Sequence, residues 1–240
     1  MNYTDMHNHI VPGIDDGSEN MDESLELVEM AYQEGIRRMI CTPHYMRGRN
    51  QYTYEELEQT FKAFATLAKQ QHSDMEFYLG NEVLYEEGIV EDLKDGKIHT
   101  MAGTRYVLIE FNIRIPYSEL YQAMKKVSNA RFRPIIAHVE RYQCLVQHED
   151  RIQELRELGI YLQMNAGSVE GGFFDEHARW CQKLLKRGYI DFIGTDAHDL
   201  ENRVPAITEA VKWITKKCGE EITEDLFWNH ADMVIRNEYI

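Results

Sequence analysis

The sequence predicts an α/β barrel built from alternating strands and helices. Seven short runs rich in β-branched and aromatic residues recur along the 240-residue chain, and most are followed by a segment with apolar residues three and four positions apart. The steps between the strand centres are roughly 27 to 38 residues, about one strand, one helix and two loops. Alternating units of this kind predict a parallel sheet, and seven of them predict a slightly irregular closed barrel. One domain spanning residues 1–240 accounts for the whole length.

The expected strands cover residues 3–7, 38–42, 75–79, 106–111, 134–137, 160–164 and 190–193. Helical periodicity is clear over residues 24–35 and 54–71, where apolar side chains share one face. Asp22 is expected to cap the first of these helices and Gly35 to end it, while Gly188 ends a later helix. We expect residues 226–240 to form an amphipathic terminal helix that packs over the barrel.

Composition restricts the partners and the compartment. The 26 Lys and Arg residues against 41 Asp and Glu residues give a net charge of -15, which disfavours nucleic acid as a partner. No apolar stretch approaches the ~18 residues of a transmembrane helix, and the first residues lack the features of a secretory signal. The four cysteines are widely spaced without a C-x-x-C pair, which predicts neither a disulfide framework nor a thiolate zinc site. We therefore expect a cytoplasmic protein that does not insert into membranes.

Histidine and acidic side chains cluster at the carboxyl ends of six expected strands. They are His7, His9, His44, Glu82, Glu110, His138, Asp196 and His198. The carboxyl ends of parallel strands meet at one face of a barrel, so these six segments are expected to converge. Residues two apart on a strand face the same side, so His7 and His9 can chelate one ion, as can groups near Asp196 and His198. Imidazole and carboxylate together suit Zn, Mn or Fe better than Ca or Mg.

The conjunction of these groups, rather than any single one, predicts a metal centre. An isolated H-x-H is more often two surface histidines, and Glu82 or Glu110 alone is more often an ion-paired carboxylate. Charged groups from six strand ends would form a desolvated, mutually repelling cluster unless cations neutralised them. The remaining histidines fall outside this pattern and are expected at the surface or in packing: His72, His99, His148, His177 and His230.

In this order, the motifs H-x-H, T-P-H, a central Glu, H-x-E-R and D-x-H resemble those of the PHP (polymerase and histidinol phosphatase) superfamily. Within that superfamily, the segments at residues 5–9, 13–17, 42–45, 108–111 and 138–141 resemble the bacterial capsule and exopolysaccharide protein-tyrosine phosphatases. The resemblance covers nearly the whole chain. One departure is Val139, where the family usually has proline.

The resemblance implies a distorted seven-stranded barrel with three divalent ions, most commonly Mn²⁺, with Fe and Zn as alternatives. Motif matching implies nine ligands in three sets: His7, His9, Glu82 and Asp196; Glu82, Glu110 and His138; and Asp16, His44 and His198. Glu82 would thus bridge the first two ions, and Asp15 is the less favoured alternative to Asp16. Arg141 and Arg203 match family positions that bind the phosphate.

The function implied by the resemblance is hydrolysis of phosphotyrosine by attack of a metal-bridged hydroxide. The implied partner is an autophosphorylated bacterial tyrosine kinase that regulates capsule or exopolysaccharide synthesis. Glu110 stands where many other superfamily members have histidine, which favours this branch over histidinol phosphatase, the main alternative. A non-catalytic metal-binding scaffold is less favoured because the ligand set looks complete. An amidohydrolase is less favoured because no lysine at a strand end offers a bridging carbamate.

A second chemistry must also be weighed, because Cys41 and Arg47 have the C-x5-R spacing of cysteine-dependent tyrosine phosphatases. That mechanism needs a loop of backbone N–H groups around the phosphate at a helix N-terminus. Pro43 removes one of these donors and forces Thr42 to be extended, and a polar loop follows instead of a helix. The thiolate mechanism is therefore disfavoured. Arg47 and Arg49 are expected either to guide an anionic peptide or to be solvated loop charges.

Overall fold

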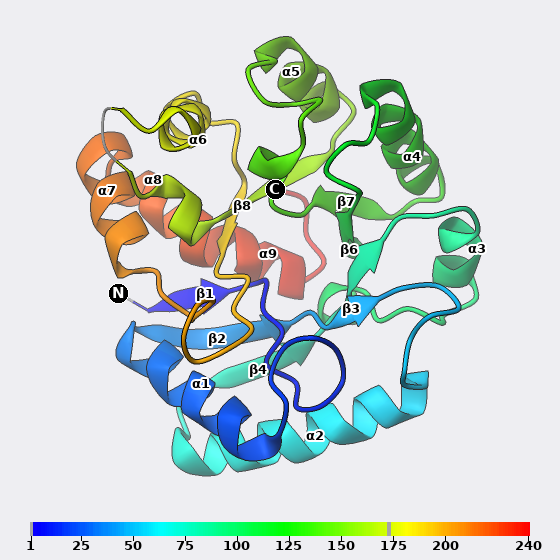
Figure 1. The fold of residues 1–240 in the computed structure, drawn as a ribbon, viewed down its shortest axis with the longest axis vertical. Coiled ribbons are helices and arrows are strands. Elements are labelled where there is room, and N and C mark those ends of the chain that lie inside the picture. Colours follow the sequence, from blue (N-terminus) through cyan, green and yellow to red (C-terminus); the bar gives the residue numbers. More distant parts are fainter. Residues whose placement is uncertain (1, 172–173) are drawn as a thin grey trace.

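The computed structural model describes residues 2–171 and 174–240, and Figure 1 shows the strands at its centre with helices around them. The strands are β1 (Tyr3–Asp5), β2 (Ile36–Cys41), β3 (His44–Tyr45), β4 (Glu76–Leu79), β5 (Glu82–Leu84), β6 (Tyr106–Glu110), β7 (Arg133–Ile136), β8 (Tyr161–Asn165) and β9 (Phe192–Gly194). The α-helices are α1 (Met21–Gln33), α2 (Tyr54–Gln71), α3 (Ile89–Lys94), α4 (Tyr117–Asn129), α5 (Glu149–Glu157), α6 (Glu176–Lys186), α7 (Thr208–Cys218), α8 (Glu220–Glu224) and α9 (His230–Ile235). Short 3-10 turns occur at Met101–Gly103, Val139–Arg141 and Ala166–Val169, and a π-helical turn at Asp225–Asn229 joins α8 to α9.

The strands form a curled parallel sheet in two sections. One section has the order β1-β2-β4 and the other the order β3-β5-β6-β7-β8-β9, and the pairs within both are parallel, as the alternation of strands and helices predicts. The central strands are buried on both faces, which is why they read as nearly continuous apolar runs. The α/β class is therefore as predicted.

The division into two sections differs from the expected ladder of seven strands. Two strand positions are interrupted, because β2 ends before Pro43 and β4 ends before Gly80. Proline has no N–H for the ladder, and the chain bends there. The Gly80 N–H donates to the carbonyl of Cys41 (2.8 Å), and a Cβ at Gly80 would lie 2.9 Å from the sulfur of Met101. The bends direct β3 and β5 toward the strand ends where the histidines and acids lie.

The carboxyl ends of β1 and β9 lie side by side. Asn8 and Ala197 form an isolated parallel bridge, and the N–H of Asp196 donates to the carbonyl of His7 (2.7 Å). The buried carboxylate of Asp5 accepts both the N–H (2.9 Å) and the hydroxyl (2.6 Å) of Thr195. In Figure 1 the dark-blue loop after β1 and the orange loop after β9 accordingly lie together in front of the strands.

The helix ends partly match the expectations. The helix α2 has the predicted bounds and begins with a capping box between Thr53 and Glu56. The prediction for α1 was wrong, because Asn20 rather than Asp22 is its N-cap: the Asn20 side chain accepts the N–H groups of Asp22 and Glu23. Asn and Asp are about equally good caps, so residue type alone did not decide between them. Gly35 and Gly188 follow α1 and α6 at positive φ, as predicted.

The C-terminal segment differs from the single helix expected over residues 226–240. Helical structure begins earlier, at Glu220, and ends at Ile235. The last residues are held instead by side chains from the first residues of β6 and β7. The Tyr106 hydroxyl donates to the carbonyl of Glu238 (2.6 Å), and Arg133 donates to the same carbonyl (2.7 Å). These bonds hold the C-terminal residues against the amino-terminal ends of β6 and β7.

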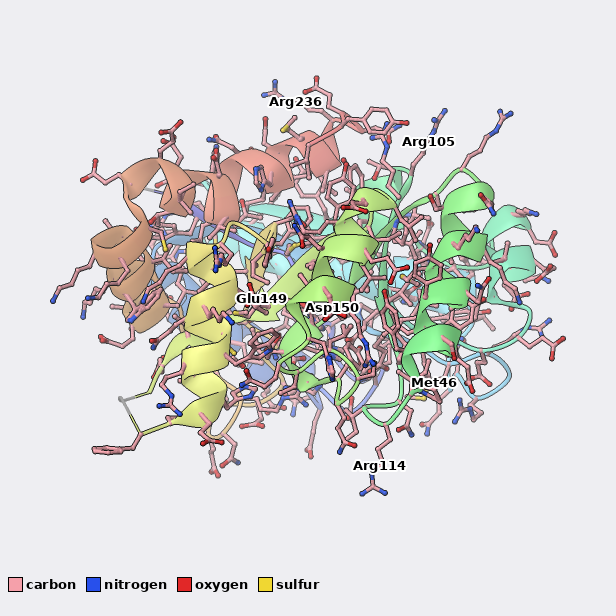
Figure 2. The ribbon with its side chains drawn as sticks, turned by 90° about the horizontal axis from the view of Figure 1, so that it is seen from above. Met46, Arg105, Arg114, Glu149, Asp150 and Arg236 are labelled. Carbon is pink, nitrogen blue, oxygen red and sulfur yellow. The ribbon has the colours of Figure 1, made fainter. Side chains whose placement is uncertain are left out.

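Figure 2 shows the molecule from above the view of Figure 1, with labelled side chains at two opposite edges. Met46 and Arg114, from loops that follow strands, lie at one edge, while Arg105 and Arg236 lie at the opposite edge. Among the helices of the described residues, none combines the length and the apolar character needed to cross a membrane.

Candidate metal centre

Three groups of side chains at the carboxyl ends of the strands bring ligand atoms within 4.8 Å of one another. They are His7, His9, Glu82 and Asp196; His9, Asp16, His44 and His198; and His44, Glu82 and Glu110. The structure thus brings together eight of the nine expected ligands in these groups. His138 lies beside them, with its Nε2 atom 2.8 Å from one oxygen of Glu82 and 3.8 Å from Glu110. The resemblance implies that Glu82 and Glu110 share an ion with His138. In the structure, the group whose ligand atoms lie within 4.8 Å contains these two glutamates with His44 instead.

Glu82 lies at the centre of the cluster. One of its oxygens is 3.2 Å from the Nε2 atoms of both His7 and His9, and its other oxygen faces His138. The side chain is only 1% exposed. Burial acts to raise the pKa of this carboxyl, but His7 and His138 lower the pKa well below its usual range. Glu82 is therefore an ionised carboxylate, with His7 and His9 at one oxygen and His138 at the other.

The donor set fits divalent cations. The Nε2 atom of His198 is buried without a hydrogen-bond partner, and the Nε2 atoms of His7 and His9 face each other at 3.4 Å. Burial, together with the nearby charges of His9 and Arg203, lowers the pKa of His198 to about 4. Its imidazole is then neutral at neutral pH, which is the form that binds metal. Buried polar atoms without partners are costly, and a cation among them would satisfy several at once.

Three of the imidazoles are oriented by hydrogen bonds at Nδ1. In His9 this atom lies 2.7 Å from an Asp15 oxygen, in His198 it lies 2.9 Å from the carbonyl of Asp196, and in His7 it lies 3.0 Å from Gln163. When Nδ1 donates, Nε2 keeps its lone pair and points into the cluster. Such outer hydrogen bonds fix the tautomer and the ring plane of metal-binding histidines.

Asp15 and Asp16, the two alternatives for one ligand position, have different surroundings. Asp15 is buried, and its oxygens accept from His9, from the N–H of His44 (2.8 Å) and from the N–H of Gly17 (3.1 Å). A Cβ at Gly17 would overlap the carbonyl of His9, so glycine permits this close approach. Asp16 is exposed and places an oxygen 3.4 Å from His44 Nε2. These contacts favour Asp16 as the ligand and give Asp15 the role of orienting His9.

Sequence reasoning missed two side chains of β8, Gln163 and Asn165. The backbone N–H of His138 can only donate, so Gln163 Oε1, 2.7 Å away, must be an acceptor. His7 Nδ1 must then carry the proton that Gln163 accepts. The Gln163 amide nitrogen donates to Asn165 Oδ1 (3.0 Å), so the Asn165 nitrogen in turn donates to Asp196 Oδ2 (2.8 Å). One chain of hydrogen bonds thereby orients two candidate ligands. The available signal was two polar residues alternating with apolar ones at the end of an apolar strand.

Replacing Gln163 with leucine is expected to weaken metal binding by about 10- to 100-fold, because His7 loses the acceptor that fixes its tautomer. Mn²⁺ affinity, measured from the electron paramagnetic resonance signal of free Mn²⁺, checks this result. Gln182→Leu is the matched control, because the Gln182 amide donates to the carbonyl of Val169 in another part of the fold. Equal Mn²⁺ affinities in both variants would contradict the assigned role.

The two expected phosphate-binding arginines both reach Asp196 from the rim of the site. The Arg141 guanidinium lies 2.9 Å from one Asp196 oxygen and the Arg203 guanidinium 2.7 Å from the other. Their side chains are 42% and 38% exposed, so both can also contact a ligand that enters from solvent. Asp196 and His138 have positive φ, a conformation that costs energy in residues other than glycine and is concentrated at functional sites.

The Cys41 thiol is fully buried, and the structure gives it no phosphate loop. Burial and the charge of Asp5 raise the pKa of this thiol well above its usual range, so it is protonated at neutral pH. Arg47 points instead to Asp92, with 2.7 Å between its Nε atom and a carboxylate oxygen. Arg47 therefore anchors its loop to α3. Arg49 pairs with Glu86 and remains at the surface.

Replacing Cys41 with alanine is expected to leave kcat/KM for a phosphotyrosyl peptide within about twofold of the original value, because a protonated core thiol cannot act as a nucleophile. Steady-state kinetics after a check of the unfolding midpoint measures this effect. His7→Ala is the comparison, since it removes a candidate ligand. A folded Cys41→Ala protein without activity would revive the thiolate mechanism.

Comparisons with known proteins agree with this geometry. Residues 3–236 match the family model described as capsular polysaccharide synthesis, CpsB/CapC. Tyrosine-protein phosphatase CpsB of Streptococcus agalactiae serotype V (strain ATCC BAA-611 / 2603 V/R) is 30% identical over 241 residues, which cover 98% of this chain and 99% of that protein. Tyrosine-protein phosphatase YwqE of Bacillus subtilis (strain 168) is 27% identical over 238 residues, with 98% and 92% covered.

Solved structures show the same likeness. A chain from the crystal structures of YwqE from Bacillus subtilis and CpsB from Streptococcus pneumoniae, described as unique metal-dependent tyrosine phosphatases, superposes with a TM-score of 0.90. Its sequence identity is 26%, and the alignment covers 99% of this chain and 96% of the other. A phosphotriesterase homology protein from Escherichia coli has a TM-score of 0.63 at 11% identity, with 98% of each chain covered, and shares the fold alone.

Proposed function

Because the chain belongs to the CpsB/CapC family of capsular polysaccharide synthesis proteins, we propose that it is a metal-dependent protein-tyrosine phosphatase. The observation that carries this function is the buried cluster of imidazoles and carboxylates around Glu82, with Arg141 and Arg203 at its rim. Cations would make the cluster attractive to phosphate even though the chain has a net charge of -15.

The proposed cofactor is a set of three divalent ions, most commonly Mn²⁺ in this family, with Fe and Zn as alternatives. The proposed ligand sets are His7, His9, Glu82 and Asp196; Glu82, Glu110 and His138; and Asp16, His44 and His198. The first set coincides with one of the groups brought together by distance, and the third lies within another. The position of Glu82 between His7, His9 and His138 supports its role as the bridging ligand.

The proposed roles of the cations and of the surrounding side chains follow from their charges. Bound divalent cations lower the pKa of water, so that hydroxide is available at neutral pH for attack on phosphorus. Arg141 and Arg203 would bind the equatorial phosphate oxygens through charge-assisted hydrogen bonds. Asp196 holds both guanidinium groups in position beforehand. A tyrosyl leaving group has a pKa of about 10, so it needs less help from an acid than a seryl alkoxide.

The proposed substrate is a phosphotyrosyl protein, specifically an autophosphorylated tyrosine kinase that regulates capsule or exopolysaccharide synthesis. The names of the relatives support a phosphotyrosyl protein as substrate, and the family description supports the link to capsule synthesis. The kinase follows from the resemblance alone. The proposed compartment is the cytoplasm, which is consistent with the free thiols of all four cysteines. The family match over residues 3–236 supports one phosphatase domain over the whole chain.

For the architecture we propose a distorted seven-stranded barrel. If β2 with β3 and β4 with β5 each count as one bent strand, the two sections of the sheet become continuous through seven strands. The bridge between Asn8 and Ala197 would then close the barrel between its first and last strands. The likeness to the Escherichia coli phosphotriesterase homology protein supports a barrel of this type.

Turnover of matched substrates tests the function. With Mn²⁺ present, kcat/KM is expected to be highest for a phosphotyrosyl peptide and lower by at least about tenfold for the phosphoseryl peptide of the same sequence and for histidinol phosphate. A preference for histidinol phosphate would move the protein to the other branch of the superfamily. Lack of turnover with each substrate and each metal would favour a binding role.

A further inference from the structure

A cavity opens beside the metal cluster, on the side of the loop that follows β3. Its volume is about 290 Å³, and one wall is formed by Asp16 and His44, which belong to the group of candidate ligands with His9 and His198. A phosphate held at the cluster would therefore have this cavity next to it. The proposed function so far involves only the candidate ligands that line this cavity, Asp16 and His44.

The rest of the lining forms the other wall and combines apolar and polar side chains. Ile14, Met46 and Tyr52 supply its apolar and aromatic part, and Arg49, Asn50 and Gln51 its polar part. The polar end of Tyr52 is already used, because its hydroxyl donates to the carbonyl of His44 (2.5 Å) and accepts from the amide of Asn81 (3.2 Å). The ring of Tyr52 is thus available for contact while its hydroxyl is satisfied. The apolar part of the lining, with the ring of Tyr52, suits a flat apolar group better than a charged one.

The loop that forms this wall is held by specific contacts before any ligand binds. Arg47 and Tyr45 both contact the buried carboxylate of Asp92, at 2.7 and 3.2 Å. The Asn50 side chain accepts the N–H of Met46 (2.7 Å), and the N–H of Asn50 donates to the carbonyl of Met46 (3.1 Å). A preformed wall costs little conformational entropy on binding.

We propose that this cavity binds the aryl ring of the substrate phosphotyrosine and so determines the preference for tyrosine. The inference rests on the proposed function. An apolar cavity of about 150 Å³ holds a benzene molecule, so the space here is sufficient for a phenyl ring and its link to the peptide. With the phosphate at the cluster, the ring lies between Met46 and Tyr52. Phosphoserine lacks the ring, and only its methylene separates the phosphate oxygen from the backbone. Its phosphate would therefore reach the cluster only if the peptide backbone entered the cavity.

Filling the cavity tests this assignment. Met46→Trp is expected to raise the inhibition constant of phenylphosphonate by about tenfold or more, because the larger side chain occupies the space in which the ring would be buried. The constant for methylphosphonate, which has no ring, is expected to stay within about twofold. Gln51→Trp, at an exposed residue of the same cavity, is the second variant. It is expected to raise the phenylphosphonate constant and leave the methylphosphonate constant unchanged, without risk to the core.

Met233→Trp is the matched control, because Met233 lies on α9, away from the cavity and from the cluster. In Figure 2 Met46 lies at the edge opposite Arg236, the residue that follows α9. Equal changes for both phosphonates, or no change for either in both cavity variants, would overturn the aryl assignment. If the unaltered protein hydrolyses phosphotyrosyl peptide, such a result removes only this inference. If it does not, the proposed function fails, and the inference with it.

Discussion

Removing divalent metal is expected to abolish phosphotyrosyl hydrolysis, and adding Mn²⁺ is expected to restore it. Without cations, Glu82 faces only imidazoles, for example His138 at 2.8 Å. Asp196 pairs with the guanidinium groups of Arg141 and Arg203. The cluster then lacks the divalent charge that would hold phosphate and activate water. Kinetics after chelation, followed by separate addition of Mn²⁺, Zn²⁺, Fe²⁺ and Mg²⁺, measures the effect.

The same titration should stabilise the fold. Metal at about 100 times its dissociation constant stabilises a protein by about 2.7 kcal/mol per site, which corresponds to roughly 5 to 10 °C in the unfolding midpoint of a chain of this size. Competing protons should weaken binding as the pH falls, and from a higher pH than for an ordinary histidine, because Asp15 and Glu82 raise the pKa of His9 well above its usual range despite burial. Full activity in chelator, with an unchanged midpoint, would exclude the metal mechanism.

Glu82→Gln is expected to lower kcat/KM by about 10³-fold or more, the largest effect of any single substitution. The change keeps the shape of the side chain but removes the negative charge that faces His7, His9 and His138. Two ligand sets share this carboxylate in the proposed centre, so both should bind metal more weakly. Metal content by mass spectrometry and anomalous scattering at the metal edges would count the remaining ions.

Glu58→Gln is the matched control for this substitution. Glu58 lies on α2, away from the cluster, and pairs with Lys62 at the surface. Surface pairs of this kind contribute only about 0–1 kcal/mol, so the control should keep both its activity and its metal content. A Glu82→Gln protein with unchanged ion content and kcat/KM would remove Glu82 from the centre of the mechanism.

Sequence periodicity predicted the class of the fold because it depends on local patterns. The helix over residues 54–71 was predicted with its correct bounds, since its apolar residues recur three and four positions apart along one face. Sequence patterns predicted less well the features that depend on the path of the chain in space. Asn20 and Asp22 are both good caps, and only the path of the chain decides which side chain reaches the free N–H groups. The last residues, held by Arg133 and Tyr106, carry no local signal for that contact.

The candidate ligands were visible because strand topology converts a sequence pattern into a position. Once a parallel sheet is expected, residues such as His7, Glu82 and Asp196 at strand ends must lie on one face. The side chains that orient them were not visible in the same way. Gln163 acts through an N–H group 25 residues away in sequence and through His7, 156 residues away. Asp15 could be separated from Asp16 only by its bonds to His9 and His44.

The sequence by itself thus determined the parallel α/β class, the candidate metal ligands at the strand ends and their common face. These follow from residue types and from spacings of two and of three to four, which depend on backbone geometry alone. Only the tertiary structure decided where the strands bend, which atoms of His7 and Asp196 face the cluster, and that an aryl-sized cavity adjoins it. Those features depend on contacts between residues distant in the chain, and packing sets such contacts to within a fraction of an ångström.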